Sequence, residues 1–297
     1  VTESGKIVQL HDFSSETETA AENGDTCEVE ITAQGQSATT IVNITREPVF
    51  QQNIGYPNEE DVTVTCYENG DLEFTGKGEL TNFGNILPWK DYEYSHVYIE
   101  ESLNIETMDS WFEGNTNLVY CDDMPKTLKT MKKAFAGCTS LEKTPNYFQC
   151  SNLKIMDYAF SGCSNLKEID ILPVNVTSAQ YTFEGCTALQ TPADLSKTSN
   201  LQNISGLHNG CINLREATDI PDSVLYMSET FMECLNIKEA VTFPNKVLDI
   251  SAAYYGDSAL ITGAMIPESV KDFSNCYQGC SALSGNLEIN SDTDAFE

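Results

Sequence analysis

Basic residues are scarce in this sequence, and the shortage restricts what the protein binds. There are 16 lysines and arginines against 45 aspartates and glutamates, which gives a formal net charge of −29 at pH 7. Nucleic acids and anionic membrane surfaces attract basic side chains, so we expect neither as a partner. The sequence also lacks an apolar run of about 18 residues, so we expect no transmembrane segment.

Residues and motifs that typically support catalysis are scarce as well. There is no G-x-S-x-G, H-E-x-x-H, P-loop or dinucleotide-binding pattern, and no calcium-binding D-x-D-x-D-G loop. The 3 histidines are scattered along the chain: His11, His96 and His208. We therefore expect a protein that is not an enzyme, with no catalytic residues, no metal and no cofactor.

What the sequence does contain is a short phrase that recurs with a cysteine at its end. It reads AFAGC at 134–138, AFSGC at 159–163 and TFEGC at 182–186. Aligned on the cysteine, successive copies are 23 or 25 residues apart. The equivalent positions, here called the cysteine column, are Asn115, Cys138, Cys163, Cys186, Cys211, Cys234, Asp257 and Cys280. The positions three residues earlier, here called the aromatic column, are Phe112, Phe135, Phe160, Phe183, His208, Phe231, Tyr254 and Tyr277.

Each copy is too short to bury its own apolar side chains, but stacked copies bury a continuous core. The repeat therefore predicts a solenoid in which each column forms a ladder along the interior. A short extended run, such as 239–243, precedes a proline at one corner of the coil. Because proline ends an extended run, this pattern predicts a short parallel strand in each coil.

The repeat also explains most of the 11 cysteines. Free cysteine behaves as a small apolar residue, so we predict reduced thiols that fill the interior. His208 and Cys211, which resemble a catalytic pair, fall in the aromatic and cysteine columns and are expected to pack like their equivalents. Cys27 and Cys66 lie upstream in alternating strand patterns, where we expect core positions, with a disulfide between them as the alternative.

The segment IPDSVLYMSETFMECLNIKEAVTFP at 220–244 resembles the BspA-like leucine-rich repeats, whose pattern is about L-x-x-L-x-L-P-x-x-V-x-x-I-x-x-x-A-F-x-x-C. Upstream, the G-x-L-x-F-x-G-x-G pattern at 70–78, the PW pair at 88–89 and VYIEESL at 97–103 are similar to the segment that opens the repeat region in such proteins. The resemblance implies an α/β solenoid: a right-handed leucine-rich-repeat coil of about eight repeats with a short parallel sheet. His208 and Asp257 depart from the family pattern.

Members of this family are typically exported to the surface of host-associated bacteria, and those with known roles are adhesins. The resemblance therefore implies an adhesin-like binding protein that is secreted or held at the bacterial cell surface, with a leader preceding Val1. The expected partner is a protein or glycan on a host or neighbouring cell, and the expected state is a monomer. The alternatives are a structural spacer that displays another domain, and a surface glycan-binding protein that uses Trp89 or Tyr92.

Changes in composition predict four segments. Residues 1–50 form a small β-rich segment, interpreted as part of an immunoglobulin-like domain, and residues 51–61 form a linker. Residues 62–104 form a β-hairpin cap with a tight turn at Asn69-Gly70, and residues 105–297 form the repeats. Two coils carry two extra residues, near 148–150 and 196–199, which we expect to bulge at the proline corner without breaking the ladders.

An exposed strand surface is where a solenoid usually binds its ligand. The residue eight positions after each member of the cysteine column is expected to face outward, and we call this set the strand column. Its members are Asp123, Asn146, Ile171, Asp194, Asp219, Thr242, Met265 and Glu288. The alternative is that this surface is only solvated. Among the aromatic residues near the cap, Trp89 and Trp111 are expected in the core.

Overall fold

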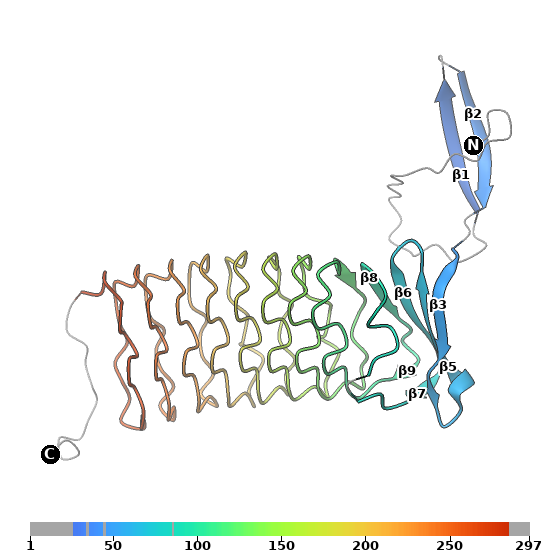
Figure 1. Ribbon diagram of the computed structural model, residues 1–297. Helices are drawn as coiled ribbons and strands as arrows, with labels where there is room; N and C mark the ends of the chain where they lie inside the picture. Colours follow the sequence, from blue (N-terminus) through green and yellow to red (C-terminus); the bar gives the residue numbers. More distant parts are fainter. Residues whose placement is uncertain (1–25, 34–35, 44–45, 85, 285–297) are drawn as a thin grey trace.

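The computed structural model describes residues 26–33, 36–43, 46–84 and 86–284. It shows a long stack of similar coils, a sheet across one end of the stack and a hairpin beyond that sheet (Figure 1). The elements are β1 Thr26–Ala33, β2 Gln36–Asn43, β3 Pro48–Asn53, β4 Gly55–Tyr56, the 3-10 turn η1 Glu59–Asp61, β5 Val62–Tyr67, β6 Asp71–Gly76, β7 Gly78–Leu80, β8 His96–Ile99, β9 Leu103–Asn104 and β10 Tyr120–Cys121.

The strands form three sheets. β1 and β2 pair antiparallel as an isolated hairpin, as the alternation in 27–44 predicts. The cap is a five-stranded sheet of order β10-β8-β6-β5-β3, and a small sheet of order β4-β7-β9 lies beside it. β5 and β6 form the predicted antiparallel hairpin, with Gly70 at φ 86° in its turn. β6, β8 and β10 then pair in parallel, which continues the direction of the coils.

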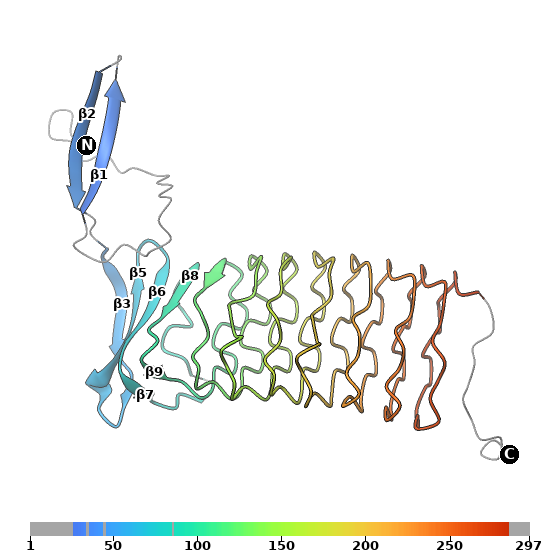
Figure 2. The same ribbon diagram turned by 180° about the vertical axis from the view of Figure 1, so that it is seen from behind.

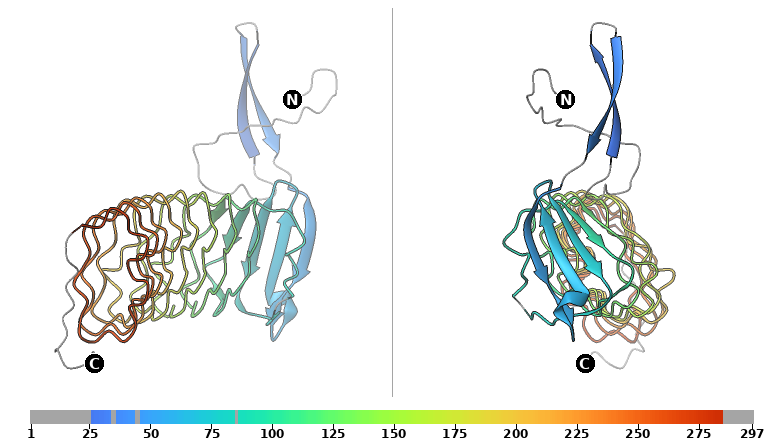
Figure 3. Two further views of the ribbon diagram at one scale, coloured as in Figure 1. Left: turned by 60° about the vertical axis from the view of Figure 1, so that its left-hand side comes forward. Right: turned by 90° about the vertical axis from the view of Figure 1, so that its right-hand side faces the viewer.

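The cap sheet lies across the end of the stack (Figure 3). One face of the sheet points inward, and there Val64, Leu72 and Val97 are fully buried. Such a cover is needed because an open end would leave strand edges and apolar ladders in contact with water.

Segment 51–61 is not a linker, contrary to the sequence-based prediction. Residues 48–53 form β3, which pairs antiparallel with β5, and Gly55–Tyr56 pairs with β7. Ile54 between them is buried. β3 is an edge strand with mostly polar, exposed side chains, so it lacks the alternating pattern that reveals a strand. Its place in the sheet depends on backbone hydrogen bonds, which composition does not reveal.

The coils are held in register by one continuous series of parallel bridges. The bridged residues, one in each coil, are Thr107, Thr130, Ile155, Ser178, Asn203, Tyr226, Asp249 and Asp272. Main-chain hydrogen bonds accompany this series; for example, the amides of Phe135 and Gly137 donate to the carbonyls of Ala159 and Ser161 at 2.8 and 2.7 Å. The two longer coils keep the same register, so their extra residues leave the ladder unbroken, as predicted. Figure 2 shows the regular stacking from behind.

Two expectations about the coil are wrong. The runs before the prolines are not regular strands: beyond β10 they contribute only single bridges, between Lys143 and Glu168 and between Glu239 and Thr262, among the described residues. The α/β class is also wrong, because the described residues contain no α-helix. The main ladder follows the prolines instead. A series of tight turns then closes each coil and leaves too few residues for a helix. In one of these turns Cys138 N donates to Phe135 O at 3.0 Å.

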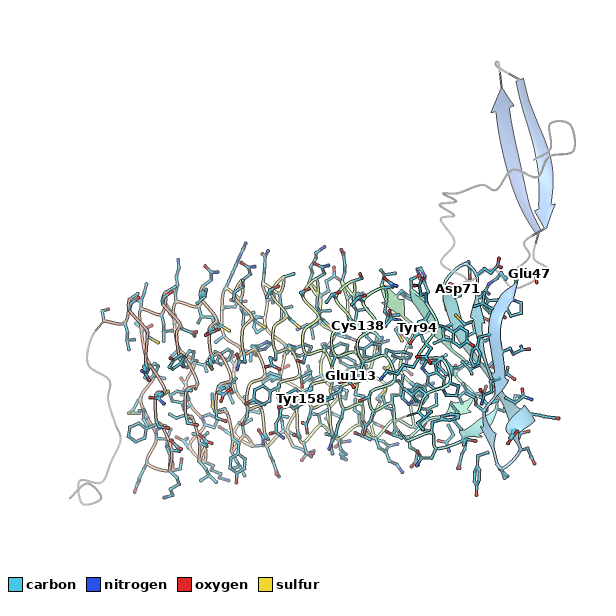
Figure 4. All side chains as sticks on the ribbon, in the orientation of Figure 1. Glu47, Asp71, Tyr94, Glu113, Cys138 and Tyr158 are labelled. Atoms are coloured by element: carbon cyan, nitrogen blue, oxygen red, sulfur yellow. The ribbon has the colours of Figure 1, made fainter. Side chains whose placement is uncertain are left out.

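The interior of the stack is built from the two columns predicted from sequence. Consecutive rings of the aromatic column have centroids 5.2–6.0 Å apart, close to the ~4.8 Å spacing of paired strands. The cysteines whose side chains are described are all free and buried, and Figure 4 shows Cys138 among them. Because Cys66 is free, a disulfide between Cys27 and Cys66 is not formed.

Cysteine in this column is a hydrogen-bond donor as well as a filler. Cys163 Sγ donates to the carbonyl of Phe135 in the preceding coil at 3.1 Å, and the other thiols of the column repeat the contact. Asn115 keeps the donor, because its Nδ2 bonds the carbonyl of Tyr94 at 3.1 Å. Asp257 differs: its Oδ1 accepts from the amide of Cys234 at 2.8 Å, and its buried Oδ2 has no partner.

Candidate binding surface

The strand column faces outward, as its spacing predicts. Six of its members are exposed, one is half-buried and one lies outside the described residues. The exposed members are Asp123, Asn146, Asp194, Asp219, Thr242 and Met265. Ile171 is half-buried, and Glu288 lies outside the described residues. The column is therefore an accessible surface of the stack, and its use in binding stays a prediction.

Neighbouring coils bring members of the strand column together in two surface hollows. Asp123 and Asn146 line a hollow of about 330 Å³, together with Glu100, Asp122 and Gln149. Thr242 and Met265 line a larger one of about 780 Å³ near the other end of the stack. Phe243 and Ala264 lie in its wall, and Met265 is 53 % exposed. The first hollow is acidic, whereas the second mixes apolar, polar and oppositely charged side chains, so the two ends of the surface favour different ligand groups.

The aromatic residues near the cap mostly belong to the core. Trp89 is fully buried; its ring centroid lies 5.1 Å from that of Trp111, and its Nε1 donates to the carbonyl of Trp111 at 3.3 Å. Trp111 and Tyr94 are also buried, which confirms the expectation for both tryptophans. Tyr92 is exposed at the surface, where it stacks on Phe50 with centroids 4.4 Å apart. Trp89 therefore offers no surface to a sugar.

Sequence reasoning missed a group of tyrosines on the outward face of the cap sheet. Tyr98 in β8 and Tyr120 in β10 have ring centroids 5.8 Å apart, and Tyr120 is 45 % exposed. Tyr67 in β5 lies on the same face. The signal was present in the alternation of Tyr98 with buried Val97 and Ile99, which puts the tyrosine on the solvent side.

Arg46 occupies part of this outward face. Its guanidinium donates to Asp71 and Glu73 at 2.6 Å each, and it lies over the ring of Tyr67, 4.1 Å from the centroid. The side chain is almost fully buried, so two carboxylates and one aromatic face replace its hydration. Arg46 joins the start of β3 to β6 across β5, and so fastens the edge strand to the sheet.

His208 and Cys211 do not form a catalytic pair. The imidazole is fully buried between Phe183 and Phe231, with ring centroids at 5.7 and 6.0 Å. Burial lowers the pKa of His208 to about 3 and raises that of the Cys211 thiol to about 12, so both groups are neutral at pH 7. Their nearest nitrogen and sulphur atoms are 4.0 Å apart. Both residues pack in their columns, as predicted.

Metal ligands do not gather anywhere in the described part of the chain: no three His, Cys, Asp or Glu residues there are placed to hold an ion. In the same residues, no helix has the length and apolar character needed to cross a membrane.

The repeat matches one protein family. The family model for the BspA-type leucine-rich repeat region, with 6 copies, matches residues 92–215 and 205–295. No curated protein matches the chain.

Several solved structures are similar to this chain. A leucine-rich repeat protein from T. pallidum is 17 % identical, with 77 % of this chain and 91 % of that one covered and a TM-score of 0.39. A leucine-rich cell surface protein from Faecalibacterium prausnitzii is 14 % identical, with 78 % and 94 % covered and a TM-score of 0.38. A leucine-rich repeat protein from Eubacterium ventriosum is 16 % identical, with 80 % and 96 % covered and a TM-score of 0.32.

Proposed function

The chain belongs to the BspA-type leucine-rich repeat family, and from this premise we propose that it is a non-enzymatic, adhesin-like binding protein, secreted or held at the bacterial cell surface. Its partner is a protein on a host or neighbouring cell, and its binding face is the strand column. The observation that carries this proposal is the exposure of equivalent residues in consecutive coils, which makes one surface out of side chains far apart in sequence.

We also propose the finer organisation that this role requires. The stack is a right-handed coil of eight repeats over 105–297, preceded by a cap that joins β3 and β4 to residues 62–104, and by a small β-rich segment upstream of β3. The protein acts as a monomer, because the strand column must stay free for the partner. The glycan alternative that uses Trp89 is withdrawn, since that ring is buried.

The test is a binding screen of the full chain against arrays of extracellular matrix proteins and cell-surface glycans, followed by variants of the strand column. The variant Asp219→Lys with Thr242→Lys reverses the charge of one exposed column residue and adds a positive charge at another. A matched control, Asp222→Lys with Ser258→Lys, makes the same change of charge at exposed residues outside the column. We expect the first pair to weaken binding about tenfold or more, and the control to leave it within about twofold.

Three outcomes oppose this proposal in different ways. Equal loss in both double variants would mean that only net charge matters, and that the column is not the binding face. Binding only to glycans would replace the protein partner with a sugar. No binding at all by a folded chain would favour the spacer, which displays other domains and recognises nothing.

A further inference from the structure

The outward face of the cap sheet carries two tyrosines and a carboxylate, Tyr98, Tyr120 and Asp122. Among the described residues, no basic side chain forms an ion pair with this carboxylate. Tyr98 and Tyr120 lie side by side, with ring planes inclined at 47°. The amide of Asp122 donates to the carbonyl of Val97 at 2.9 Å, which continues the β8–β10 pairing and puts Asp122 across from Tyr98. The hydroxyl of Tyr120 donates to Asp122 Oδ1 at 3.4 Å.

The same sheet shows which chemical group this combination accepts. Arg46 lies over the ring of Tyr67 in β5 and between two carboxylates of the neighbouring strand β6, Asp71 and Glu73. A guanidinium is therefore already bound here by one tyrosine face and two acids. Guanidinium suits such a site because it is planar, is weakly hydrated and donates along fixed directions.

Two strands further along, the same residue types recur without a cation. Tyr98 and Tyr120 supply the rings, Asp122 supplies a carboxylate, and Asp123 lies next to it in the wall of the acidic hollow. Among the described residues, the ion pairs of the neighbourhood join Arg46 to its two acids, His96 to Asp71 at 3.8 Å and Lys126 to Glu101, and none reaches Asp122 or Asp123. The Asp122 carboxylate also affects Tyr120: burial and this negative charge together raise the pKa of the Tyr120 hydroxyl to about 12.

We propose that Tyr98, Tyr120 and Asp122 bind an arginine side chain from a basic segment of the partner protein. The arginine stacks on the tyrosine rings as Arg46 stacks on Tyr67, and its nitrogens donate to Asp122 and Asp123. Asp123 belongs to the strand column, so this site forms the cap end of the binding face. The inference rests on the proposed function and adds the chemistry of the partner: an arginine-containing segment attracted to a chain of net charge −29.

The test uses the full chain and a labelled peptide of alternating arginine and glycine, with fluorescence anisotropy as the readout. Two peptides serve as controls: one with citrulline in place of arginine, which keeps the shape and removes the charge, and one with lysine. We expect the arginine peptide to bind more tightly than the lysine peptide, and the citrulline peptide not to bind. Equal affinity for arginine and lysine would overturn the proposal, because net charge alone would then explain binding.

Matched variants locate the site. Tyr120→Ala and Asp122→Asn should each weaken binding of the arginine peptide about fivefold, and Tyr120→Phe, which keeps the ring, should stay within about twofold of the parent. Tyr226→Ala and Asp222→Asn are the controls, since Tyr226 is 41 % exposed in the main bridge series and Asp222 is an exposed acid outside the strand column. Unchanged thermal melting of each variant shows that the fold is intact.

The outcomes separate this inference from the proposed function. If a protein partner from the screen binds normally to Tyr120→Ala and Asp122→Asn, the arginine site is wrong and the wider binding role stands. If the arginine peptide binds in a Tyr120-dependent way but no protein partner binds, the site is real and the adhesin-like role is wrong. Equal losses in the site and control variants would overturn the location of the site.

Discussion

The imidazole Nε2 of His208 accepts a hydrogen bond from the backbone amide of Ala193, 3.3 Å away. In two later coils, the hydroxyls of Tyr254 and Tyr277 accept from the equivalent amides at 2.9 Å. Where phenylalanine fills the aromatic column, that amide is often absent or bonded elsewhere; in the coil of Phe160 the equivalent position is Pro145, which has no N–H. The polar rings at 208, 254 and 277 thus each provide a hydrogen-bond acceptor for one backbone amide, which a phenylalanine cannot do.

His208→Phe should therefore destabilise the protein although phenylalanine is the usual residue in the column. The amide of Ala193 would lose its partner, at a cost of about 1–3 kcal/mol, whereas His208→Tyr should recover part of the loss. The lowered pKa of His208 means that its contribution is complete above its unfolded pKa of about 6.5 and is lost as pH falls toward 3. Urea unfolding at pH 7 and pH 5 measures both effects. A His208→Phe protein as stable as the parent at pH 7 would contradict this account.

Asp257 should make the stability fall as pH rises. Burial raises its pKa to about 8, above its unfolded value of about 4, so the folded state holds the proton more tightly than the unfolded state. Stability from this group is complete below pH 4 and is lost as pH rises to 8. Asp257→Asn keeps the acceptor for Cys234 and adds the donor that Asn115 uses in the first coil.

We expect Asp257→Asn to be more stable than the parent above pH 7, by an amount on the order of a few kcal/mol, and to lose this part of the pH dependence. Thermal melts between pH 5 and pH 9 measure the difference. The same dependence in parent and variant would mean that the Asp257 carboxyl is ionised in the folded state.

Gly206→Ala should cost more than Gly210→Ala. Both glycines have positive φ, at 64° and 72°, so both substitutions strain the backbone. At Gly206 an added Cβ would also come within 2.2 Å of the Tyr181 ring, whereas at Gly210 the nearest atoms are 3.7 Å away. The ring of Tyr181 lies across Gly206, and its hydroxyl bonds Glu229 two coils on at 3.1 Å.

The difference between the two glycine variants should be about 1–3 kcal/mol in the free energy of unfolding, which isolates the clash from the backbone strain. Adding Tyr181→Ala to Gly206→Ala should reduce that difference. If the two glycine variants are equally stable, the Tyr181 ring moves aside without cost and its contact with Gly206 does not contribute to the free energy of unfolding.

Phe160→Ala should cost about 3–5 kcal/mol, because its ring is stacked between two others in the middle of the stack. Cys163→Ser should cost less, about 1 kcal/mol, since a hydroxyl can still donate to the carbonyl of Phe135 although it is too short to fill the space. Denaturant unfolding of both variants measures the order.

Thiol titration should detect the column cysteines only after unfolding, because burial raises the pKa of their thiols. For Cys163 the pKa reaches about 12.

The interior of this protein could be predicted from sequence, because each of its positions is sampled once in every coil. The aromatic and cysteine columns, the reduced thiols and the structural role of His208 all follow from aligned copies. The part that failed has no such repetition. β3 occurs once, exposes polar side chains and is held by main-chain bonds to β5, so the sequence carried no pattern for it.

The candidate site was only partly predictable for the same reason. The strand column could be located by counting from Cys138 and its equivalents. The Tyr98–Tyr120 pair could not, because it depends on the parallel register of β8 and β10, which aligns residues 24 positions apart at the boundary between cap and coil. Trp89 and Trp111, by contrast, were expected in the core from sequence and are buried there.

The unequal length of the coils has a consequence for how such a protein can change over generations. The bridge series from Thr107 to Asp272 keeps its pairing across steps of 23 and of 25 residues, so added residues are absorbed on the side that carries the strand column. Insertions and deletions can therefore diversify that side while the hydrogen-bonded side is inherited intact. A lineage under pressure to recognise altered targets can vary loop length there without first having to re-evolve a foldable scaffold.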